Sequence, residues 1–264
     1  MTETFQITPE QAEAYEEFLV PALTAQWTDP MLDIAGVAPG QRVLDVACGT
    51  GVLARAAARR VGSEGHVVGV DLNPAMIDVA RRLRPDLEWR QGDAAVLPFD
   101  DDGFDAVLCQ ASVFFFPDVP AAIAEMARVA RAGGVVAIQT FAGLDDQPVY
   151  GRFIETVLRH SGEDARSLID TYFSQGDLPA LRATFERAGL RVERVSSRMG
   201  VAAYGSWEDL IETEVKNTPL VDRFTDDQIG EIRAESEDLL RRHQGADGSL
   251  NLPIRAHLIA GRLP

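Results

Sequence analysis

Residues 43–51, with the sequence VLDVACGTG, constrain the fold of this chain more than any other stretch. A β-branched run, an acid and two glycines one residue apart, followed by an alanine- and arginine-rich segment over 52–60, predict a strand, a tight turn and a helix. Glycine lets a ligand lie against the backbone, and the first turn of a helix presents unpaired N–H groups. The stretch is typical of the first turn of a nucleotide-binding α/β unit.

Acidic residues stand where three successive predicted strands end. Asp45 lies at the carboxyl end of the first strand, and Asp71 ends the second. Asp93 follows the third strand, directly after Gly92. Because the carboxyl ends of parallel strands meet at one crevice, we expect these three carboxylates to converge there.

With these motifs, the sequence resembles the class I S-adenosylmethionine-dependent methyltransferases, in particular the branch related to quinone-biosynthesis and natural-product methyltransferases. The resemblance covers about half of the chain and rests on five stretches, which are 45–51, 69–76, 92–94, 104–118 and the paired glycines 133–134. Two positions depart from the family pattern. Ala47 replaces the first glycine of the D-x-G-x-G-x-G form, and Ala132 replaces the proline usual before the paired glycines.

The resemblance implies S-adenosylmethionine as the cofactor and assigns residues to its adenosine part. Asp71 would bind the ribose hydroxyls, with Leu72 and Met76 lining the adenine slot. Asp93 would accept a hydrogen bond from the adenine amino group, and the Ala94 N–H would reach a ring nitrogen. A helix N-cap for Asp71 and a simple turn acid for Asp93 are the structural alternatives.

The same resemblance assigns residues to the methionine part of the cofactor. Ala47, Gly49 and Gly51 would lie under it. Asp45 would orient that turn or the ammonium group, and the Gln110 backbone would help to hold the ammonium group. Without the resemblance, the spacing of the glycines also fits the loose pattern G-x-G-x-x-A of dinucleotide-binding proteins, which leaves a nicotinamide-dependent enzyme open.

Strand and helix patterns alternate along the middle of the chain. Strands are expected over 42–46, 66–70, 87–91, 105–109 and 135–140, and helices over 52–61, 74–84 and 119–131. This rhythm predicts an α/β fold with a doubly wound, mostly parallel sheet. By resemblance the sheet is Rossmann-like with seven strands, and the last two, over 190–195 and 253–260, form an antiparallel pair.

We expect a single domain over residues 1–264. It would consist of an N-terminal helical segment (1–38), a cofactor-binding core (40–141) and a substrate-side half (142–264). Within that half, helical patterns over about 203–245 predict an insertion of two helices that covers the substrate end. Two further helices are expected over 148–160 and 178–188.

Candidate residues for a substrate pocket come from scattered positions. A capping box over 8–11 predicts the start of the N-terminal helix, which in the resembling family lies over the cofactor. This places Tyr15 and Trp27 near the pocket, although packing is an equal alternative for each. Phe115 follows the fourth strand, with two of the three residues Phe114, Phe115 and Phe116 expected in the core. His160 is the histidine considered as a base, and further aromatic candidates are Phe141, Tyr150, Tyr172, Phe173, Tyr204 and Trp207.

The net charge of −16 excludes some partners. Such a surface repels phosphate backbones and anionic lipid, so we expect neither nucleic acid nor a membrane as a partner. The two cysteines are not in a metal-binding arrangement, and no metal site is expected. A polar N-terminus and the lack of a long apolar run indicate a cytoplasmic protein. Both a monomer and a homodimer remain open.

The sequence therefore predicts an enzyme that transfers a methyl group from S-adenosylmethionine to an oxygen, carbon or nitrogen atom of a small organic molecule, in secondary or quinone-type metabolism. No catalytic residue is assigned. Alternatives are an S-adenosylmethionine-binding enzyme that catalyses a cyclisation or rearrangement, an NAD-dependent oxidoreductase, and a cofactor-sensing protein without activity.

Overall fold

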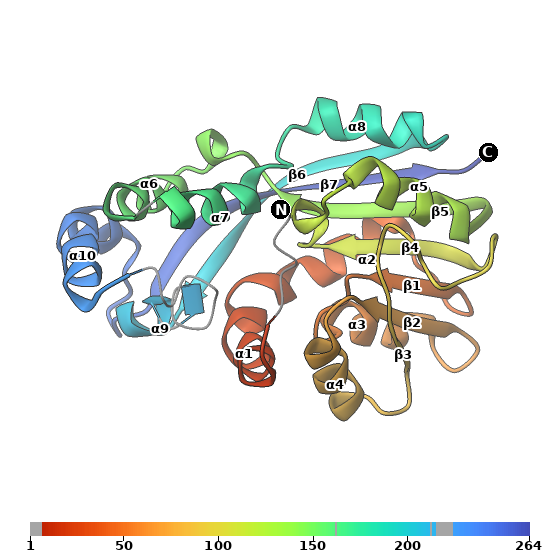
Figure 1. Cartoon of the computed structure of the whole chain (residues 1–264), viewed down its shortest axis with the longest axis horizontal. Coiled ribbons are helices and arrows are strands. Elements are labelled where there is room, and N and C mark those ends of the chain that lie inside the picture. The colour runs from red at the N-terminus through yellow and green to blue at the C-terminus, as the bar shows by residue number, and fades with distance from the viewer. Residues whose placement is uncertain (1–6, 162, 212, 215–223) are drawn as a thin grey trace.

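The computed structural model describes residues 7–161, 163–211, 213–214 and 224–264. Seven strands form one sheet: β1 (Arg42–Val46), β2 (His66–Asp71), β3 (Glu88–Gln91), β4 (Phe104–Gln110), β5 (Ala130–Phe141), β6 (Arg191–Tyr204) and β7 (Leu250–Arg262). Their order across the sheet is β3-β2-β1-β4-β5-β7-β6, and of these strands β7 alone runs antiparallel to its neighbours (Figure 1). This confirms the doubly wound, mostly parallel sheet. Its switch point lies between β1 and β4.

Helices cover both faces of the sheet and one end of it. They are α1 (Pro9–Ala14), α2 (Thr28–Ala35), α3 (Val52–Val61), α4 (Pro74–Leu83), α5 (Val119–Val129), α6 (Tyr150–His160), α7 (Glu163–Phe173), α8 (Leu178–Arg187), α9 (Trp207–Ile211) and α10 (Asp226–Leu240). Apolar side chains of α2, α3 and α4 pack on one face, and those of α5 and α8 pack on the other. The helices α6, α7, α9 and α10 gather beyond the sheet's end, which gives the molecule its second lobe (Figure 1).

The N-terminal helix begins where the capping box predicts and continues past a proline. Thr8 caps α1, and the Gln11 side-chain oxygen accepts a hydrogen bond from Thr8 N. The chain then forms a π-helical segment, Tyr15–Thr24, with Pro21 inside it. Proline has no N–H to donate and clashes in a regular α-helix, so the wider turns accommodate it. The segment leads through Trp27 into α2.

The last two strands are longer than the sequence pattern indicates. β6 and β7 pair from Arg191 with Arg262 to Tyr204 with Leu250. β6 is an edge strand with mostly exposed side chains, so apolar alternation stops early although the main chain stays paired. Helix α7 was not predicted. The two expected cap helices correspond to α9 and α10, while residues 212 and 215–223 of that cap, and 1–6 of the N-terminal segment, lie outside the described residues.

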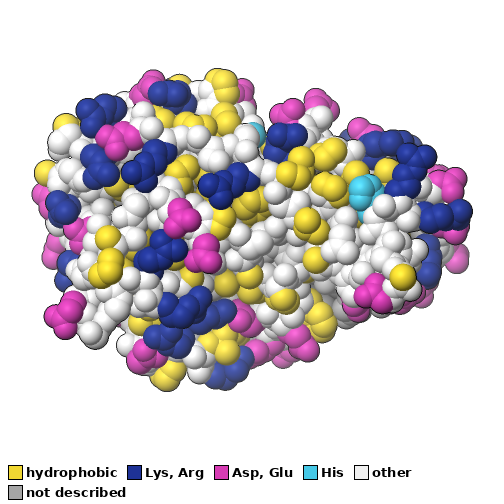
Figure 2. Space-filling view, turned by 180° about the vertical axis from the view of Figure 1, so that it is seen from behind, with side chains coloured by type: hydrophobic (Ala, Val, Ile, Leu, Met, Phe, Trp, Pro, Cys, Tyr) yellow, Lys and Arg dark blue, Asp and Glu magenta, His cyan; other side chains and the backbone are white. Residues whose placement is uncertain are grey.

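The surface carries charges of both signs. On the face opposite to that of Figure 1, Arg side chains are interspersed with Asp and Glu side chains (Figure 2). In the part of the chain that the structure describes, no helix combines the length and the apolar character needed to cross a bilayer.

Candidate functional site

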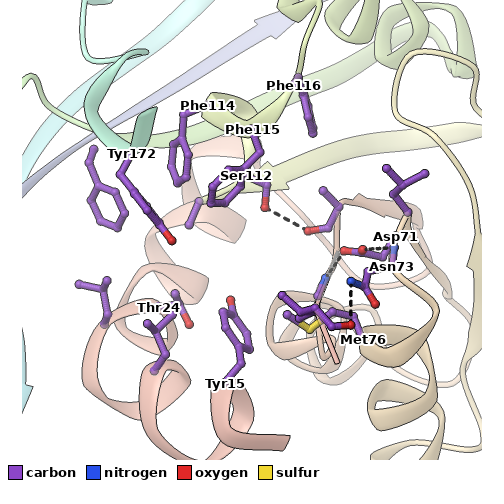
Figure 3. A pocket seen from close by; sticks show the side chains of 18 of the residues that line it. Tyr15, Thr24, Asp71, Asn73, Met76, Ser112, Phe114, Phe115, Phe116 and Tyr172 are labelled. Atoms are coloured by element: carbon purple, nitrogen blue, oxygen red, sulfur yellow. Dashed lines mark hydrogen bonds between the residues drawn. The ribbon is translucent and has the colours of Figure 1, made fainter. Parts of the chain in front are cut away.

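Asp71, at the carboxyl end of β2, is held by two main-chain donors. Its Oδ2 accepts a hydrogen bond from Gly49 N at 2.8 Å, and its Oδ1 accepts one from Asn73 N at 2.8 Å (Figure 3). Burial raises the pKa of this carboxyl group. Asn73 rather than Asp71 is the N-cap of α4, because its Oδ1 accepts from Ala75 N at 2.9 Å. The N-cap alternative for Asp71 is therefore wrong.

Asp45 lies behind the turn after β1. The side chain is 2% exposed, and its Oδ2 accepts a hydrogen bond from Ala54 N, in the first turn of α3, at 2.9 Å. Burial raises the pKa of Asp45 to about 8. This position suits the expected role of orienting the turn, since the carboxyl group does not reach the cavity described below.

Gly51 closes the turn in a conformation that requires glycine. Its φ is +86°, and an added Cβ would lie 2.3 Å from the ring of Trp89 on β3. The turn therefore packs directly over an aromatic ring. Gly51 serves this close approach and does not line the cavity.

The ends of β1 and β4 hold two alanines in a strained backbone conformation. Ala47 and Ala111 both have a φ of +53°, which is uncommon for residues other than glycine. The Ser112 hydroxyl lies 3.2 Å from Ala47 O and 2.9 Å from Gln110 O, so it joins the two strand ends (Figure 3). The Gln110 side chain points to the N-terminal segment, where it donates to Thr24 O at 3.0 Å.

The N-terminal segment is clamped onto the start of α3. Glu16 accepts a hydrogen bond from Thr50 Oγ1 at 2.5 Å and pairs with the Arg55 guanidinium at 2.7 Å. Tyr15 covers the turn, because a Cβ added to Gly49 would lie 3.7 Å from its ring. Sequence reasoning missed Glu16, since no local pattern relates it to residues more than thirty positions away.

Asp93 closes a turn of its own at the rim of the site. Its Oδ1 accepts a hydrogen bond from Ala95 N at 2.8 Å, and the side chain is exposed. This bond is the turn arrangement considered as the alternative for Asp93. Both Asp93 and Ala94 also line the cavity, so the adenine contact stays a prediction.

One cavity of about 300 Å³ lies at the carboxyl ends of β1, β2 and β4. It has two parts. The motif half is lined by Tyr15, Ala47, Gly49, Asp71, Leu72, Asn73, Met76, Gly92, Asp93, Ala94 and Ser112. It thus gathers seven of the ten expected cofactor residues, while Asp45, Gly51 and Gln110 lie behind its wall. The volume is within the range of small-molecule sites.

The aromatic half of the cavity lies under α6 and α7. It is lined by Phe114, Phe115, Phe141, Tyr150, Phe153, Ile154, Val157, Tyr172, Phe173 and Ile254, with Thr213 and Glu214. Phe115 lies 4.6 Å from Phe114 and 5.1 Å from Tyr172 between ring centroids. All three phenylalanines line the cavity and only Phe114 of them is buried in the core, so the expectation that two of the three belong to the core is wrong.

Tyr15 and Tyr172 mark the place where the two halves meet. Their hydroxyl groups point toward each other across the open space, with Ser112 and Thr24 beside them (Figure 3). Both rings come from helices that cover the sheet's end, Tyr15 from the N-terminal segment and Tyr172 from α7.

Two expected pocket residues lie outside the cavity. Trp27 is 2% exposed, and its ring packs under β6 at Gly200, where an added Cβ would lie 2.6 Å from it. His160 ends α6 and faces α10, with its ring nitrogens each 3.1 Å from a carboxylate oxygen of Glu231 and Glu235. Trp27 and His160 are therefore corrected to packing and helix-pairing residues.

Glu214 is the cavity residue that sequence reasoning missed most completely. It lies in the cap, and Tyr204 on β6 donates a hydrogen bond to its Oε1 at 2.5 Å. Burial raises the pKa of Glu214. No motif precedes this residue, so only the fold brings it to the cavity.

Comparison with known proteins agrees with this geometry. A family model described as "Methyltransferase domain" matches residues 43–134. The demethylmenaquinone methyltransferase of Renibacterium salmoninarum is 38% identical over 130 residues, which are 49% of this chain and 52% of that protein. The ubiquinone/menaquinone biosynthesis C-methyltransferase UbiE of Teredinibacter turnerae is 33% identical over 179 residues, which are 62% of this chain and 72% of that protein.

The likeness to solved structures extends over more of the chain. The BH2331 protein of Bacillus halodurans superimposes with a TM-score of 0.64 at 21% identity, over 90% of this chain and 98% of that one. At this identity the likeness concerns the fold. The matched sequence spans about half the length of the first of the curated relatives.

Proposed function

The chain belongs to the class I S-adenosylmethionine-dependent methyltransferases, and we propose that it methylates a small, largely apolar acceptor of the quinone type. The observation that carries this proposal is the division of one cavity into a motif half and an aromatic half. The first suits the cofactor and the second suits an acceptor ring. The names of the quinone methyltransferases to which the chain is similar support the acceptor class.

The residues of the motif half fit the cofactor. Asp71 offers carboxylate oxygens to the ribose hydroxyls, and Leu72 and Met76 provide apolar walls for the adenine. Among the described residues that line the cavity, the charged side chains are Asp71, Asp93 and Glu214, all of them acidic. An acidic lining suits a cofactor that carries an ammonium and a sulfonium group.

For methyl transfer, the main task of the protein is to align the acceptor with the methyl group of the cofactor. When bound, S-adenosylmethionine would supply an electrophilic methyl group and leave as the neutral thioether, and the proton of the acceptor would pass to solvent. Tyr15, Phe115 and Tyr172 border the space where the acceptor would approach. Holding two reactants in line in this way can supply about 7–11 kcal/mol in favourable cases.

The start of α3 argues against a nicotinamide dinucleotide. Such a ligand places its pyrophosphate at the N-terminus of this helix. Here two acidic side chains occupy that region, since Asp45 binds Ala54 N and Glu16 binds Thr50 and Arg55. These contacts take up donors at the start of the helix that a pyrophosphate would need.

Calorimetry and a labelled-cofactor assay test the proposal together. We expect S-adenosylhomocysteine to bind and NAD not to bind. With methyl-labelled S-adenosylmethionine and a panel of demethylated naphthoquinols, kept reduced, label is expected in the organic product. Binding of NAD instead, or a changed acceptor that carries no label, would contradict the proposal and favour an oxidoreductase or a cyclisation.

The setting of the enzyme is part of the same proposal. We propose that the enzyme acts in the cytoplasm. We also propose that it forms one domain, because a single sheet joins residues 42–262. Its net charge of −16 supports the absence of nucleic-acid and membrane partners.

A further inference from the structure

A cluster of tyrosines around one carboxyl group lies in the aromatic half of the cavity. Tyr204 donates to Glu214 Oε1 at 2.5 Å, and Tyr150 lies close enough to the same carboxyl group to favour its charged form. Tyr150 and Tyr204 are 3% and 4% exposed. Neither the sheet nor the cofactor residues need a carboxyl group at this place, and an uncompensated buried charge is costly.

Tyr172 lies near both the cluster and the N-terminal segment. Tyr172 is within electrostatic range of both Glu214 and Tyr15, and Tyr15 lies against Gly49 of the motif half. Tyr172 therefore stands between the cluster and the turn after β1. A flat molecule that reaches from the cofactor's methyl group past Tyr172 would bring its distal edge toward Glu214.

From this geometry we propose that Glu214 recognises the acceptor by accepting a hydrogen bond from a hydroxyl group on its aromatic ring. This proposal rests on the function proposed above. It adds that a hydroxyl group on the aromatic ring is the feature by which the pocket recognises the acceptor. A carboxyl group has about four acceptor sites, so bonding to tyrosines is compatible with one more donor. The hydrogen bond from Tyr204 helps to hold the carboxyl group in place.

The charges around the cavity favour a neutral hydroxyl over other groups. An anionic acceptor would meet Glu214 and, among the described lining residues, no cationic side chain. An ammonium group would be held in its protonated form by the neighbouring carboxylate and would be repelled by the sulfonium. Burial raises the pKa of Glu214, so this carboxyl group is protonated more readily than an exposed one, and it keeps an oxygen that accepts hydrogen bonds in either form.

Ligand discrimination in the full-length protein saturated with S-adenosylhomocysteine tests the proposal. The probes are 1-naphthol and 1-methoxynaphthalene, which lacks the donor. We expect 1-naphthol to bind at least about tenfold more tightly than the methyl ether, the effect of one strong hydrogen bond. Equal binding of these two probes would overturn the proposal.

Variants separate recognition from a structural role of the carboxyl group. Glu214→Gln keeps an acceptor for Tyr204 and is expected to reduce the discrimination to less than about threefold, whereas Tyr204→Phe keeps the carboxyl group and should preserve it. Glu208→Gln, an exposed residue of α9 paired with Arg233, is the matched control. An equal loss of discrimination between the probes in Glu214→Gln and Tyr204→Phe would indicate that the hydrogen bond between the two residues has only a structural role.

Failure of this inference is distinct from failure of the proposed function. In Glu214→Gln we expect the affinity for S-adenosylhomocysteine to change less than about twofold, since the cofactor residues lie in the motif half. If the wild-type protein does not bind S-adenosylhomocysteine, that result would count against the methyltransferase function. Normal cofactor binding without discrimination between the probes would count against Glu214 alone.

Discussion

The two halves of the cavity are held together in different ways. In the motif half, side chains of short reach bind the main chain, as Asp71 binds Gly49 N and Asn73 N and Asp45 binds Ala54 N. In the aromatic half, rings from distant segments pack on one another, and Glu214 with its tyrosines is the polar exception. The first arrangement fixes one geometry for one cofactor. In the second arrangement, a substitution of one aromatic side chain would change the shape of the cavity. We therefore expect the aromatic half to determine which acceptor binds.

The largest effect is expected at the close contact directly behind the motif half. Gly51→Ala places a Cβ 2.3 Å from the Trp89 ring at a φ of +86°. Adding the costs of overpacking and backbone strain, we expect a loss of about 4 kcal/mol in the free energy of unfolding, measured by denaturant titration. Gly230→Ala in α10 is the control, because nothing lies within 4 Å of its added Cβ. Comparable losses in both variants would erase the difference between the halves.

The same contrast explains what the sequence could predict. The motif half depends on local spacing, since Asp71, Gly92 and Asp93 sit at strand ends that the strand pattern marks. The aromatic half joins Phe115, Tyr172 and Glu214, which lie far apart in the chain, and nothing local relates them. Trp27 and His160 were misplaced for this reason, because their types suit a pocket while their helix faces turn elsewhere.

A second test uses the buried carboxyl group behind the turn. Burial raises the pKa of Asp45 from 3.8 to about 8, so between these pH values the folded state binds a proton that the unfolded state has released. The free energy of unfolding therefore falls as the pH rises through this window. From pH 5 to pH 7 the contribution of Asp45 is at most about 3 kcal/mol. Denaturant titrations of Asp45→Asn should show a smaller fall than the wild type.

The control for this test has its pKa shifted the other way. Asp86 pairs with Arg84, which lowers the pKa of Asp86 to about 2. Its pKa effect is therefore fully present at both pH 5 and pH 7, and Asp86→Asn should show the same fall in stability over this window as the wild type. An unchanged fall in Asp45→Asn would mean that Asp45 is ionised throughout.

The third test concerns the cofactor. Asp71→Ala removes the proposed partner of the ribose hydroxyls and should weaken S-adenosylhomocysteine binding by about 1.5–3 kcal/mol, measured by calorimetry. Asp78→Ala on the exposed side of α4 serves as the control, since its partner is Arg81. Wild-type affinity in Asp71→Ala would show that another residue holds the ribose.

The smallest effect is expected where the chain departs from the family pattern. Ala47 has a φ of +53°, a value that glycine adopts without strain. Ala47→Gly should raise the free energy of unfolding by at most about 1 kcal/mol, because relief of strain is offset by the entropy of the unfolded chain. Ala58→Gly, inside α3, should instead lower it by about 0.5–1 kcal/mol. Destabilisation by both changes would mean that the Ala47 methyl group contributes packing.

A crystal structure of the protein with S-adenosylhomocysteine tests the central claim most directly. We predict that the ribose hydroxyls lie within hydrogen-bonding distance of Asp71 and the adenine beside Asp93 and Ala94. The sulfur should face Tyr15, Tyr172 and the aromatic half. An adenosine bound elsewhere, or a sulfur turned away from the aromatic half toward solvent, would contradict the account.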